Sequence, residues 1–319
     1  MSVHIDDLAQ EIIDGRRLSR HDDVHFFETC DLAALCQGAD LIREQLCGNK
    51  VSLCAIINGK SGHCSENCKF CAQSSFNPTA CQSYTFLAEE AIFKEAEFNE
   101  KEGVHRFSIV TSGKALTGRE FEQAVHVYKR INGELSIGLC ASMGFLSQDQ
   151  FKQLKAAGVT RYHHNIETSR RYFPFICTTH TYEMKINTIK MAQAEGFEIC
   201  SGGIIGMGET FADRLDMALS LSELGIDSIP INVLLPIEGT PLESLPNLTE
   251  EEILRTIAMF RFINPTSSIC FGAGRKLLAS NGEQAFKSGA NATITGNMLT
   301  TTGSTIQADK KMLYTLFSH

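Results

Sequence analysis

The sequence predicts an α/β fold, a TIM-type (β/α)8 barrel with an N-terminal helical extension. Two observations predict it: eight short strand-like runs alternate with amphipathic helical stretches, and no linker composition interrupts them. A doubly wound sheet is the competing architecture for such an alternation. We expect the helical extension over residues 1–47 and a single barrel domain with a C-terminal helix over 48–319.

The individual elements follow from local composition. The strand candidates are, in chain order, VSLCAII (51–57), RFSIVTS (106–112), LSIGLCAS (135–142), TRYHHNIE (160–167), FEICSGGII (197–205), DSIPINVLL (227–235), SSICFG (267–272) and NATIT (291–295). Amphipathic stretches such as LAEEAIFKEAEFNEKEG and TEEEILRTIAMFRFI fill the intervals, and several end at Gly or precede Pro, as helices do.

Charge and composition limit the possible partners. The formal net charge is −8 and the pI about 5.7, with no basic run, which argues against nucleic acid or an anionic membrane and favours a small ligand. The sequence shows no membrane span and no secretion signal, so we expect a cytoplasmic location. Twelve cysteines in a chain expected in the cytoplasm indicate metal or redox chemistry. Core packing is the favoured interpretation for five of them: Cys30, Cys36, Cys47, Cys81 and Cys177.

Alternate residues of the expected strands form an apolar set and a polar set. The apolar set suits the helix-facing side: Phe107, Ile109, Ile137, Leu139, Tyr162, Ile166, Ile199, Ile229, Ile231, Val233, Ile269 and Phe271. The other set would face the lumen: Ser52, Cys54, Arg106, Ser108, Gly138, Cys140, His163, Asn165, Glu167, Glu198, Cys200, Asn232, Ser268 and Cys270. A barrel interior packed for stability carries Val, Ile and Leu. We therefore expect a polar cofactor and substrate in the lumen; an internal hydrogen-bond network would explain the amides but not the thiols.

Three more thiols crowd one loop after the first strand. In GHCSENCKFCAQSS, Cys64, Cys68 and Cys71 would lie at the C-terminal mouth of a barrel, where barrel active sites are built. Three thiolates can hold a [4Fe-4S] cluster and leave one iron open to a substrate or cofactor. A zinc site completed by a distant Cys or His is the alternative.

This loop, with its aromatic residue before the last Cys, resembles that of the radical S-adenosylmethionine (SAM) superfamily. The wider motif, together with CSGGIIGMGET (200–210), SIPINVLLPIEGTPL (228–242) and FGAGR (271–275), is similar to the biotin synthases, over about residues 47–302. The resemblance implies a [4Fe-4S] cluster on the three thiols, with SAM chelating the open iron and yielding a 5′-deoxyadenosyl radical.

The resemblance also implies ligand-binding residues. For SAM they are Phe70, Gly203, Ile204 and Gly206 around the adenine, Glu167 on the ribose and Lys185 on the methionyl carboxylate. For dethiobiotin they are Asn165 and Asn232 on the ureido ring, and Thr300 and Thr301 on the valeryl carboxylate. A helix start, a hairpin or a solvated loop remains the alternative for the two threonines. The family has Asp at position 167 and Arg at 185. Glu167 and Lys185 keep the charge at each position, but the length of the side chain changes, and a lysine cannot form the paired hydrogen bonds of an arginine.

The sequence departs from the familiar biotin synthases inside the barrel. Those enzymes bind a second, [2Fe-2S] cluster through three Cys and one Arg; here the first Cys is Ser108 and the Arg is Cys270, whereas Cys140 and Cys200 match. Cys54 adds a further thiol where the family has Ser. Three of these four cysteines suit an auxiliary cluster of the 4Fe type with an extra sulfide, with [2Fe-2S] as the alternative.

The implied reaction is sulfur insertion that converts dethiobiotin to biotin. The radical would abstract hydrogen from an unactivated carbon, a sulfide of the auxiliary cluster would trap the carbon radical, and a second round would close the ring. His163 need not be an acid or base in this reaction; it would orient a ligand or satisfy a network with Glu198 or Arg161. The resemblance also implies a flavodoxin- or ferredoxin-type electron donor and a homodimer. The alternatives are hydrogenase-maturase-like or methylornithine-synthase-like enzymes and a zinc-binding non-enzyme.

Overall fold

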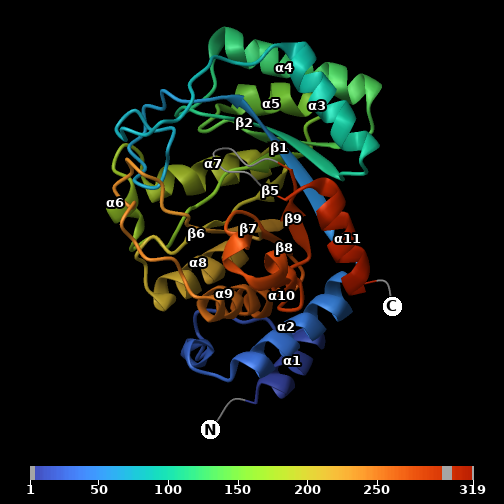
Figure 1. The fold of residues 1–319 in the computed structure, drawn as a ribbon, viewed down its shortest axis with the longest axis vertical. Helices are drawn as coiled ribbons and strands as arrows, with labels where there is room; N and C mark the ends of the chain where they lie inside the picture. Colours follow the sequence, from blue (N-terminus) through green and yellow to red (C-terminus); the bar gives the residue numbers. More distant parts are fainter. Residues whose placement is uncertain (1–3, 297–303, 318–319) are drawn as a thin grey trace.

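The computed structural model describes residues 4–296 and 304–317, which form a closed parallel β-barrel surrounded by helices (Figure 1). The strands of this described part are β1 (Ser52–Lys60), β2 (Arg106–Thr111), β3 (Gly138–Ser142), β4 (Arg161–His163), β5 (Glu198–Cys200), β6 (Gly203–Ile205), β7 (Ser228–Val233), β8 (Ser268–Phe271) and β9 (Ala292–Ile294). Their order is β5-β4-β3-β2-β1-β9-β8-β7-β6, and a β5–β7 pairing closes the ring. The predicted (β/α)8 barrel is confirmed.

The expected fifth strand, 197–205, is wrong as a single element, because the chain breaks it into β5 and β6. The Glu167 N–H donates to Gly202 O, and the Ile204 N–H donates to Glu167 O, so the two glycines lie directly against the neighbouring chain. A Cβ on Gly203 would lie 2.3 Å from Glu167 O. β5 and β6 therefore share one of eight strand positions, and glycine is needed where the strand is interrupted.

The close contact between Gly203 and Glu167 also explains why the fourth strand is shorter than expected. The regular ladder of β4 ends at His163, and the chain returns to the sheet only at Glu167, which forms an isolated parallel bridge with Gly203. Glu167 has a φ of +70°, a conformation that is costly for a residue with a Cβ. β1, in contrast, continues past the expected end at residue 57 and carries the chain up to the three-thiol loop.

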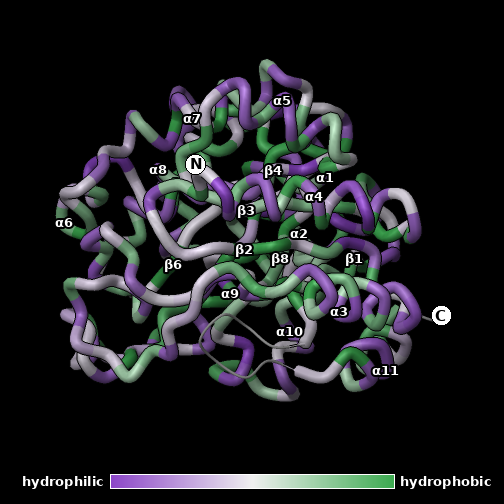
Figure 2. The backbone as a smooth tube through the Cα atoms, turned by 90° about the horizontal axis from the view of Figure 1, so that it is seen from above, coloured by the Kyte–Doolittle hydropathy of each residue, from purple (hydrophilic) through white to green (hydrophobic). Residues whose placement is uncertain are grey.

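Helices cover the outside of the barrel. They are α3 (Glu89–Lys101), α4 (Gly118–Glu134), α5 (Gln148–Ala156), α6 (Phe173–Ile176), α7 (Tyr182–Ala194), α8 (Phe211–Glu223), α9 (Glu250–Ile263), α10 (Glu283–Phe286) and α11 (Ile306–Phe317). Ser147, Thr210 and Thr249 open α5, α8 and α9 with capping boxes, which satisfy the first free N–H groups of each helix. In Figure 2 the hydrophilic stretches gather on the surrounding helices and loops.

The N-terminal helices α1 (Ile5–Ile13) and α2 (Leu32–Cys47) lie outside the barrel, where α2 packs against α9 (Figure 1). Two buried arginines of α9 join the parts: Arg255 donates to Phe27 O and Cys30 O, and Arg261 donates to the Cys47 sulfur at 3.3 Å. Cys47 therefore has a polar partner, contrary to the expectation of packing alone. None of the described helices has the length and apolar character needed to cross a bilayer.

Candidate active site

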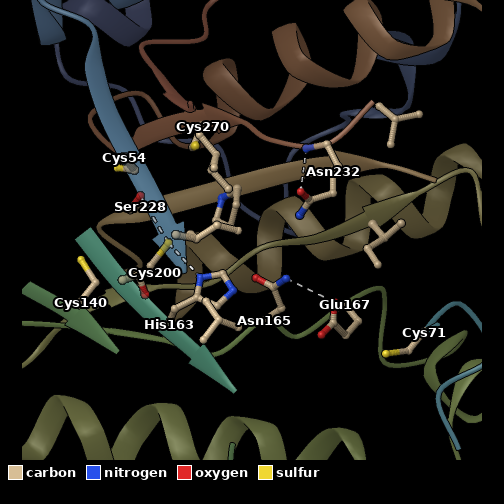
Figure 3. Close-up of a pocket in the computed structure, with 18 of the residues that line it drawn as sticks. Cys54, Cys71, Cys140, His163, Asn165, Glu167, Cys200, Ser228, Asn232 and Cys270 are labelled. Atoms are coloured by element: carbon tan, nitrogen blue, oxygen red, sulfur yellow. Dashed lines mark hydrogen bonds between the residues drawn. The ribbon is translucent and has the colours of Figure 1, made fainter. Parts of the chain in front are cut away.

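The lumen holds a cavity of about 360 Å³ to which every strand of the described barrel contributes a side chain. Figure 3 shows its arrangement: Cys71 lies at one end, Cys54, Cys140, Cys200 and Cys270 lie at the other, and polar side chains occupy the space between. A single cavity thus reaches from the three-thiol loop at the mouth to a second group of thiols inside the barrel.

The four inner thiols lie on four different strands and line this cavity, as the alternation of strand residues predicts. Burial raises the pKa of Cys140 to about 11 and that of Cys200 to about 12, and it raises the pKa of Cys54 and Cys270 as well. Without a metal they are neutral thiols at pH 7. Metal binding would displace the protons, since the thiolate is the ligand form.

Two arginines place positive charge beside these thiols. Arg106 is the register partner of Cys54, and Arg161 is the register partner of Cys140, so each guanidinium starts next to a sulfur. Both bind Glu198, at 2.8 and 2.9 Å. The Glu198 side chain is 45% exposed and lies outside the cavity, so its expected place in the lumen is wrong: it lies at the N-terminal end of the barrel. The arginines would offset the negative charge of bound thiolates.

His163 contacts a thiol and neither of its expected partners. Its Nδ1 lies 3.2 Å from the Cys200 sulfur, its register partner in β5. Burial, with help from the positive charges of Lys185 and Arg161, lowers the pKa of His163 to about 4, so the ring is neutral at pH 7. A neutral imidazole can orient the Cys200 sulfur without adding charge to the cavity.

Ser108, the position for which the resemblance implies a Cys in the familiar biotin synthases, has an unsatisfied hydroxyl. Its Oγ is buried and has no hydrogen-bond partner in the part of the chain that the structure describes. Since buried polar atoms in folded proteins normally have a partner, this oxygen is available to a group that occupies the lumen.

The three-thiol loop is held in shape by its own polar groups. The Cys64 N–H donates to Gln73 O and the Ser75 N–H donates to Cys64 O, which closes the loop as a small parallel bridge. The Asn77 amide donates to the carbonyls of Cys68 and Cys71, at 3.1 and 2.8 Å. All three cysteines are half-buried. The loop therefore holds its thiols in place without depending on the metal for its fold.

One of these thiols is paired with a cysteine outside the loop. The sulfurs of Cys68 and Cys177 and a ring nitrogen of His180 lie within 4.8 Å of one another. The hydrogen bond between the two sulfurs raises the pKa of Cys68 and lowers that of Cys177, because the pair shares one proton. Packing alone, the interpretation favoured for Cys177, is therefore wrong: it is buried, but it has polar partners. No sequence signal reveals the contact, since the two residues are over a hundred positions apart.

Three of the polar residues expected to bind SAM or the substrate line the cavity: Asn165, Glu167 and Asn232. Lys185 does not line it, but its Nζ lies 3.6 Å from Glu167 Oε1; Lys185 is buried and Glu167 half-buried. The Asn165 amide donates to Glu167 at 3.3 Å, while its oxygen accepts from the Gly202 N–H at 3.0 Å. Asn232 likewise accepts from the Ala273 N–H at 3.0 Å and donates to Gly203 O. These contacts orient both amides and still leave each one hydrogen and one lone pair for a ligand.

The glycine-rich segment after β6 forms a tight turn at the cavity mouth. The buried Glu209 carboxylate accepts from the N–H groups of Gly206 and Met207 and from Arg214, each at 2.7 Å. Gly206 has a φ of +90°, which favours glycine at this position. Phe70 and Ile204 line the cavity beside this turn. Thr300 and Thr301 lie outside the described residues.

Among the strand residues that line the cavity but are absent from the expected lumen-facing set are Arg161, Ser228 and Pro230. Strand alternation in the sequence does indicate their inward direction. Ser228 and Pro230 share the strand parity of Asn232, and Arg161 shares that of His163. Alternation alone places them inside, and their composition gives no second signal.

Comparison with known proteins identifies the family. Residues 60–221 match the family described as Radical SAM superfamily, and residues 230–316 match the Biotin and Thiamin Synthesis associated domain. A biotin synthase of Alkaliphilus metalliredigens is 59% identical over 99% of this chain and 100% of its own. A biotin synthase of Clostridium beijerinckii is 60% identical over 97% of this chain and 98% of its own.

Solved structures add the fold. Methylornithine synthase superposes with a TM-score of 0.78 at 20% identity, covering 90% of this chain and 85% of that one. A maturase of the [FeFe]-hydrogenase superposes with a TM-score of 0.81 at 18% identity, covering 99% and 75%. At such identities the likeness concerns the fold alone. Full-length identity near 60% decides the assignment: the chain belongs to the biotin synthase family of the radical SAM superfamily.

Proposed function

We propose that this protein converts dethiobiotin to biotin by radical SAM chemistry, with sulfur taken from a cluster inside the barrel. The observation that carries the proposal is the single cavity that joins Cys71 at the mouth to the four inner thiols, with two asparagines between them (Figure 3). A radical generated at one end and sulfur stored at the other end would meet a substrate held in the middle.

The three-thiol loop fits a [4Fe-4S] cluster. Its thiols are half-buried on a preformed loop, and Cys71 borders the cavity, so an iron without a protein ligand would face the lumen. The ligands of a [4Fe-4S] cluster bind separate iron atoms and are spread around the cluster. The ligand atoms of Cys68, Cys177 and His180 lie close together, within 4.8 Å of one another, and do not suit such a cluster. When bound, this cluster and SAM supply a 5′-deoxyadenosyl radical. Glu167 and Lys185 are a carboxylate and an ammonium suited to the ribose and the methionyl carboxylate.

The inner thiols fit a second cluster, for which we propose a 4Fe core with an extra sulfide on three of Cys54, Cys140, Cys200 and Cys270. Four buried thiols face one cavity, and Arg106 and Arg161 supply compensating charge. When bound, this cluster supplies the inserted sulfur. A [2Fe-2S] core, which needs four terminal ligands, is the alternative, and it would use all four thiols and leave none over.

The chain's own residues position the substrate and exclude water. Asn165 and Asn232 each offer one donor and one acceptor, which matches the N–H and C=O groups of a ureido ring. Leu234, Leu235 and Ile237 line the cavity and shield it from solvent. We propose the valeryl carboxylate for Thr300 and Thr301, and a small redox protein of the flavodoxin or ferredoxin type as electron donor.

The function is tested by an anaerobic assay of the reconstituted protein with dethiobiotin, SAM and a reductant. We expect biotin and 5′-deoxyadenosine in the products, detected by mass spectrometry. 5′-Deoxyadenosine without biotin, under conditions where a known biotin synthase makes both, would contradict the assigned substrate.

The composition of the inner cluster is tested separately by counting iron and acid-labile sulfide in the same preparation. Two 4Fe clusters predict about eight irons per chain, whereas a 4Fe and a 2Fe cluster predict about six. A count close to six would refute the second 4Fe core and leave the assigned reaction standing.

A further inference from the structure

Cys177 has no role in the reaction described above, yet it lies against a proposed cluster ligand. Its sulfur lies within 4.8 Å of the Cys68 sulfur, and its side chain is 4% exposed. It follows α6 directly, on a segment more than a hundred residues from the three-thiol loop. Two features determine the role of Cys177: the contacts that hold its segment against the loop, and the acceptor of its thiol hydrogen.

The contact is fixed by several hydrogen bonds between the loop and the segment after α6. The Lys69 N–H donates to Ile176 O at 3.0 Å. Asn67 Oδ1 accepts from the N–H groups of Thr178 and Thr179, at 2.9 and 3.2 Å, and its amide donates to the Thr178 hydroxyl at 2.7 Å. Main-chain contacts on both sides of Cys177 therefore set its position, independently of its own side chain.

The other acceptors near the Cys177 thiol are largely occupied. Asn67 Oδ1 accepts the Cys177 S–H at 3.3 Å, but it is a crowded neutral acceptor, because it also accepts the N–H groups of Thr178 and Thr179 and the Thr179 hydroxyl. His180 Nδ1, at 3.4 Å, lies 2.5 Å from the Glu66 carboxylate, which only accepts, so this nitrogen carries a hydrogen and donates it to Glu66. The Thr179 hydroxyl, at 3.4 Å, already accepts the Asn67 N–H. The Cys68 sulfur lies within 4.8 Å, and as a charged thiolate it would be a stronger acceptor than the neutral Asn67 oxygen.

Iron binding would decide the direction of this hydrogen bond. Cys68 bound to iron is a thiolate and can only accept, so in a hydrogen bond between the two sulfurs Cys177 would be the donor. One-electron reduction of an iron–sulfur cluster adds negative charge that spreads onto the ligand sulfurs. A donor to one of these sulfurs stabilises the reduced state more than the oxidised state.

We propose that Cys177 is a positioning residue that donates an S–H···S hydrogen bond to Cys68 and raises the reduction potential of the cluster on the three-thiol loop. The inference rests on the proposed function of that loop. Cys177 is not a ligand in this account, because Cys64, Cys68 and Cys71 supply the three cluster thiolates. Its effect is to make the cluster easier to reduce by a given electron donor.

The test is a redox titration of the anaerobically reconstituted protein, following the EPR signal that changes on addition of SAM, which selects the cluster with the open iron. In Cys177→Ala we expect the ratio of reduced to oxidised cluster at the wild-type midpoint to fall about tenfold, which corresponds to about 59 mV for one electron. Cys177→Ser keeps a donor and is expected to hold the midpoint at or above the wild-type value. Cys36→Ala removes a buried thiol of α2 and should leave the midpoint unchanged.

An unchanged midpoint in Cys177→Ala, or an equal fall in Cys177→Ser, would overturn the hydrogen-bond role. A loss of iron from the SAM-responsive cluster of Cys177→Ala would overturn it too, because Cys177 would then be a ligand. A wild-type protein that binds no iron on this loop would contradict the proposed function itself, and the inference with it.

Discussion

Single side chains decide what the barrel interior can bind. Cys270 is one of four thiols around the same cavity, and the sequence resemblance implies an Arg at this position in the familiar biotin synthases. Exchanging a cation for a thiol removes positive charge and adds a potential metal ligand. Arg161, at the register position beside Cys140, keeps a guanidinium in the lumen. If the implied exchange holds, Arg161 would offset thiolate charge in place of the missing Arg, and the ligand set would differ.

The role of Cys270 is tested by Cys270→Ala. We expect biotin formation to be lost, because the inner cluster loses a ligand, while formation of 5′-deoxyadenosine continues, because the three-thiol loop is untouched. Both products are measured by mass spectrometry in one anaerobic reaction, with Cys36→Ala as the matched buried thiol. A normal biotin yield from Cys270→Ala would remove Cys270 from the mechanism.

At the scale of elements, the break between β5 and β6 links the fold to the site. Gly203 lets the chain approach Glu167 closely, and the same contact holds Glu167 at its positive φ and next to Lys185. Local geometry that is unfavourable by itself is therefore maintained by the neighbouring strand. Such strain is commonly stored at functional sites, where the surrounding fold can support it.

Gly203→Ala tests this arrangement. The new Cβ would lie 2.3 Å from Glu167 O and 2.5 Å from the Met217 sulfur. We expect destabilisation by about 1–3 kcal/mol, as for overpacking in a core. The matched control is Gly133→Ala on α4, where a Cβ meets nothing within 4 Å; it should be neutral or stabilising by up to about 1 kcal/mol. Urea denaturation followed by circular dichroism compares them, and equal stability of both variants would be inconsistent with the close approach.

The start of α8 gives a pH-dependent prediction. Burial alone would raise the pKa of Asp213, but hydrogen bonds from Arg171, Ser169 and Thr210 outweigh it and lower the pKa to about 2. The folded pKa lies below the ordinary value of 3.8, so the unfolded chain binds the proton first as the pH falls. This stabilisation is complete above about pH 4 and is lost as the pH falls towards 2.

Asp213→Asn should therefore reduce the free energy of unfolding by about 1–2 kcal/mol at pH 7 and by much less at pH 2.5. The value at pH 7 is kept low because solvent screens the exposed Arg171. Asp149→Asn, an exposed acid in the first turn of α5, is the control and should change stability by less than about 0.5 kcal/mol. Urea denaturation at the two pH values measures both. A deficit of Asp213→Asn that stays the same at pH 2.5 would show that charge is not its cause.

At the scale of the whole molecule, the barrel places two groups of thiols along one cavity. The mouth belongs to the loop after β1, and the interior belongs to strands that are far apart in sequence but adjacent in the ring. A closed parallel barrel brings alternate residues of all its strands to one axis. One chain can thus hold two metal centres with the substrate between them.

Much of this arrangement could be predicted from the sequence, because strand alternation has a strict period of two. That period placed Cys54, Cys140, Cys200 and Cys270 in the lumen. It failed at Glu198, because periodicity carries no information on depth and this residue lies at the open N-terminal end. The contact of Cys68 with Cys177 could not be predicted, since it arises only when the segment after α6 folds over the loop. The domain boundary at residue 47 and the homodimer stay predictions.

We propose that the sulfur of the product comes from the cluster inside the barrel. Reconstituting the protein with ³⁴S-labelled sulfide, removing free sulfide and running one anaerobic turnover tests it directly. We predict that mass spectrometry finds the heavy isotope in the biotin formed, and that Cys270→Ala forms no labelled biotin. Biotin carrying sulfur of natural isotopic composition from the fully labelled protein would contradict the account.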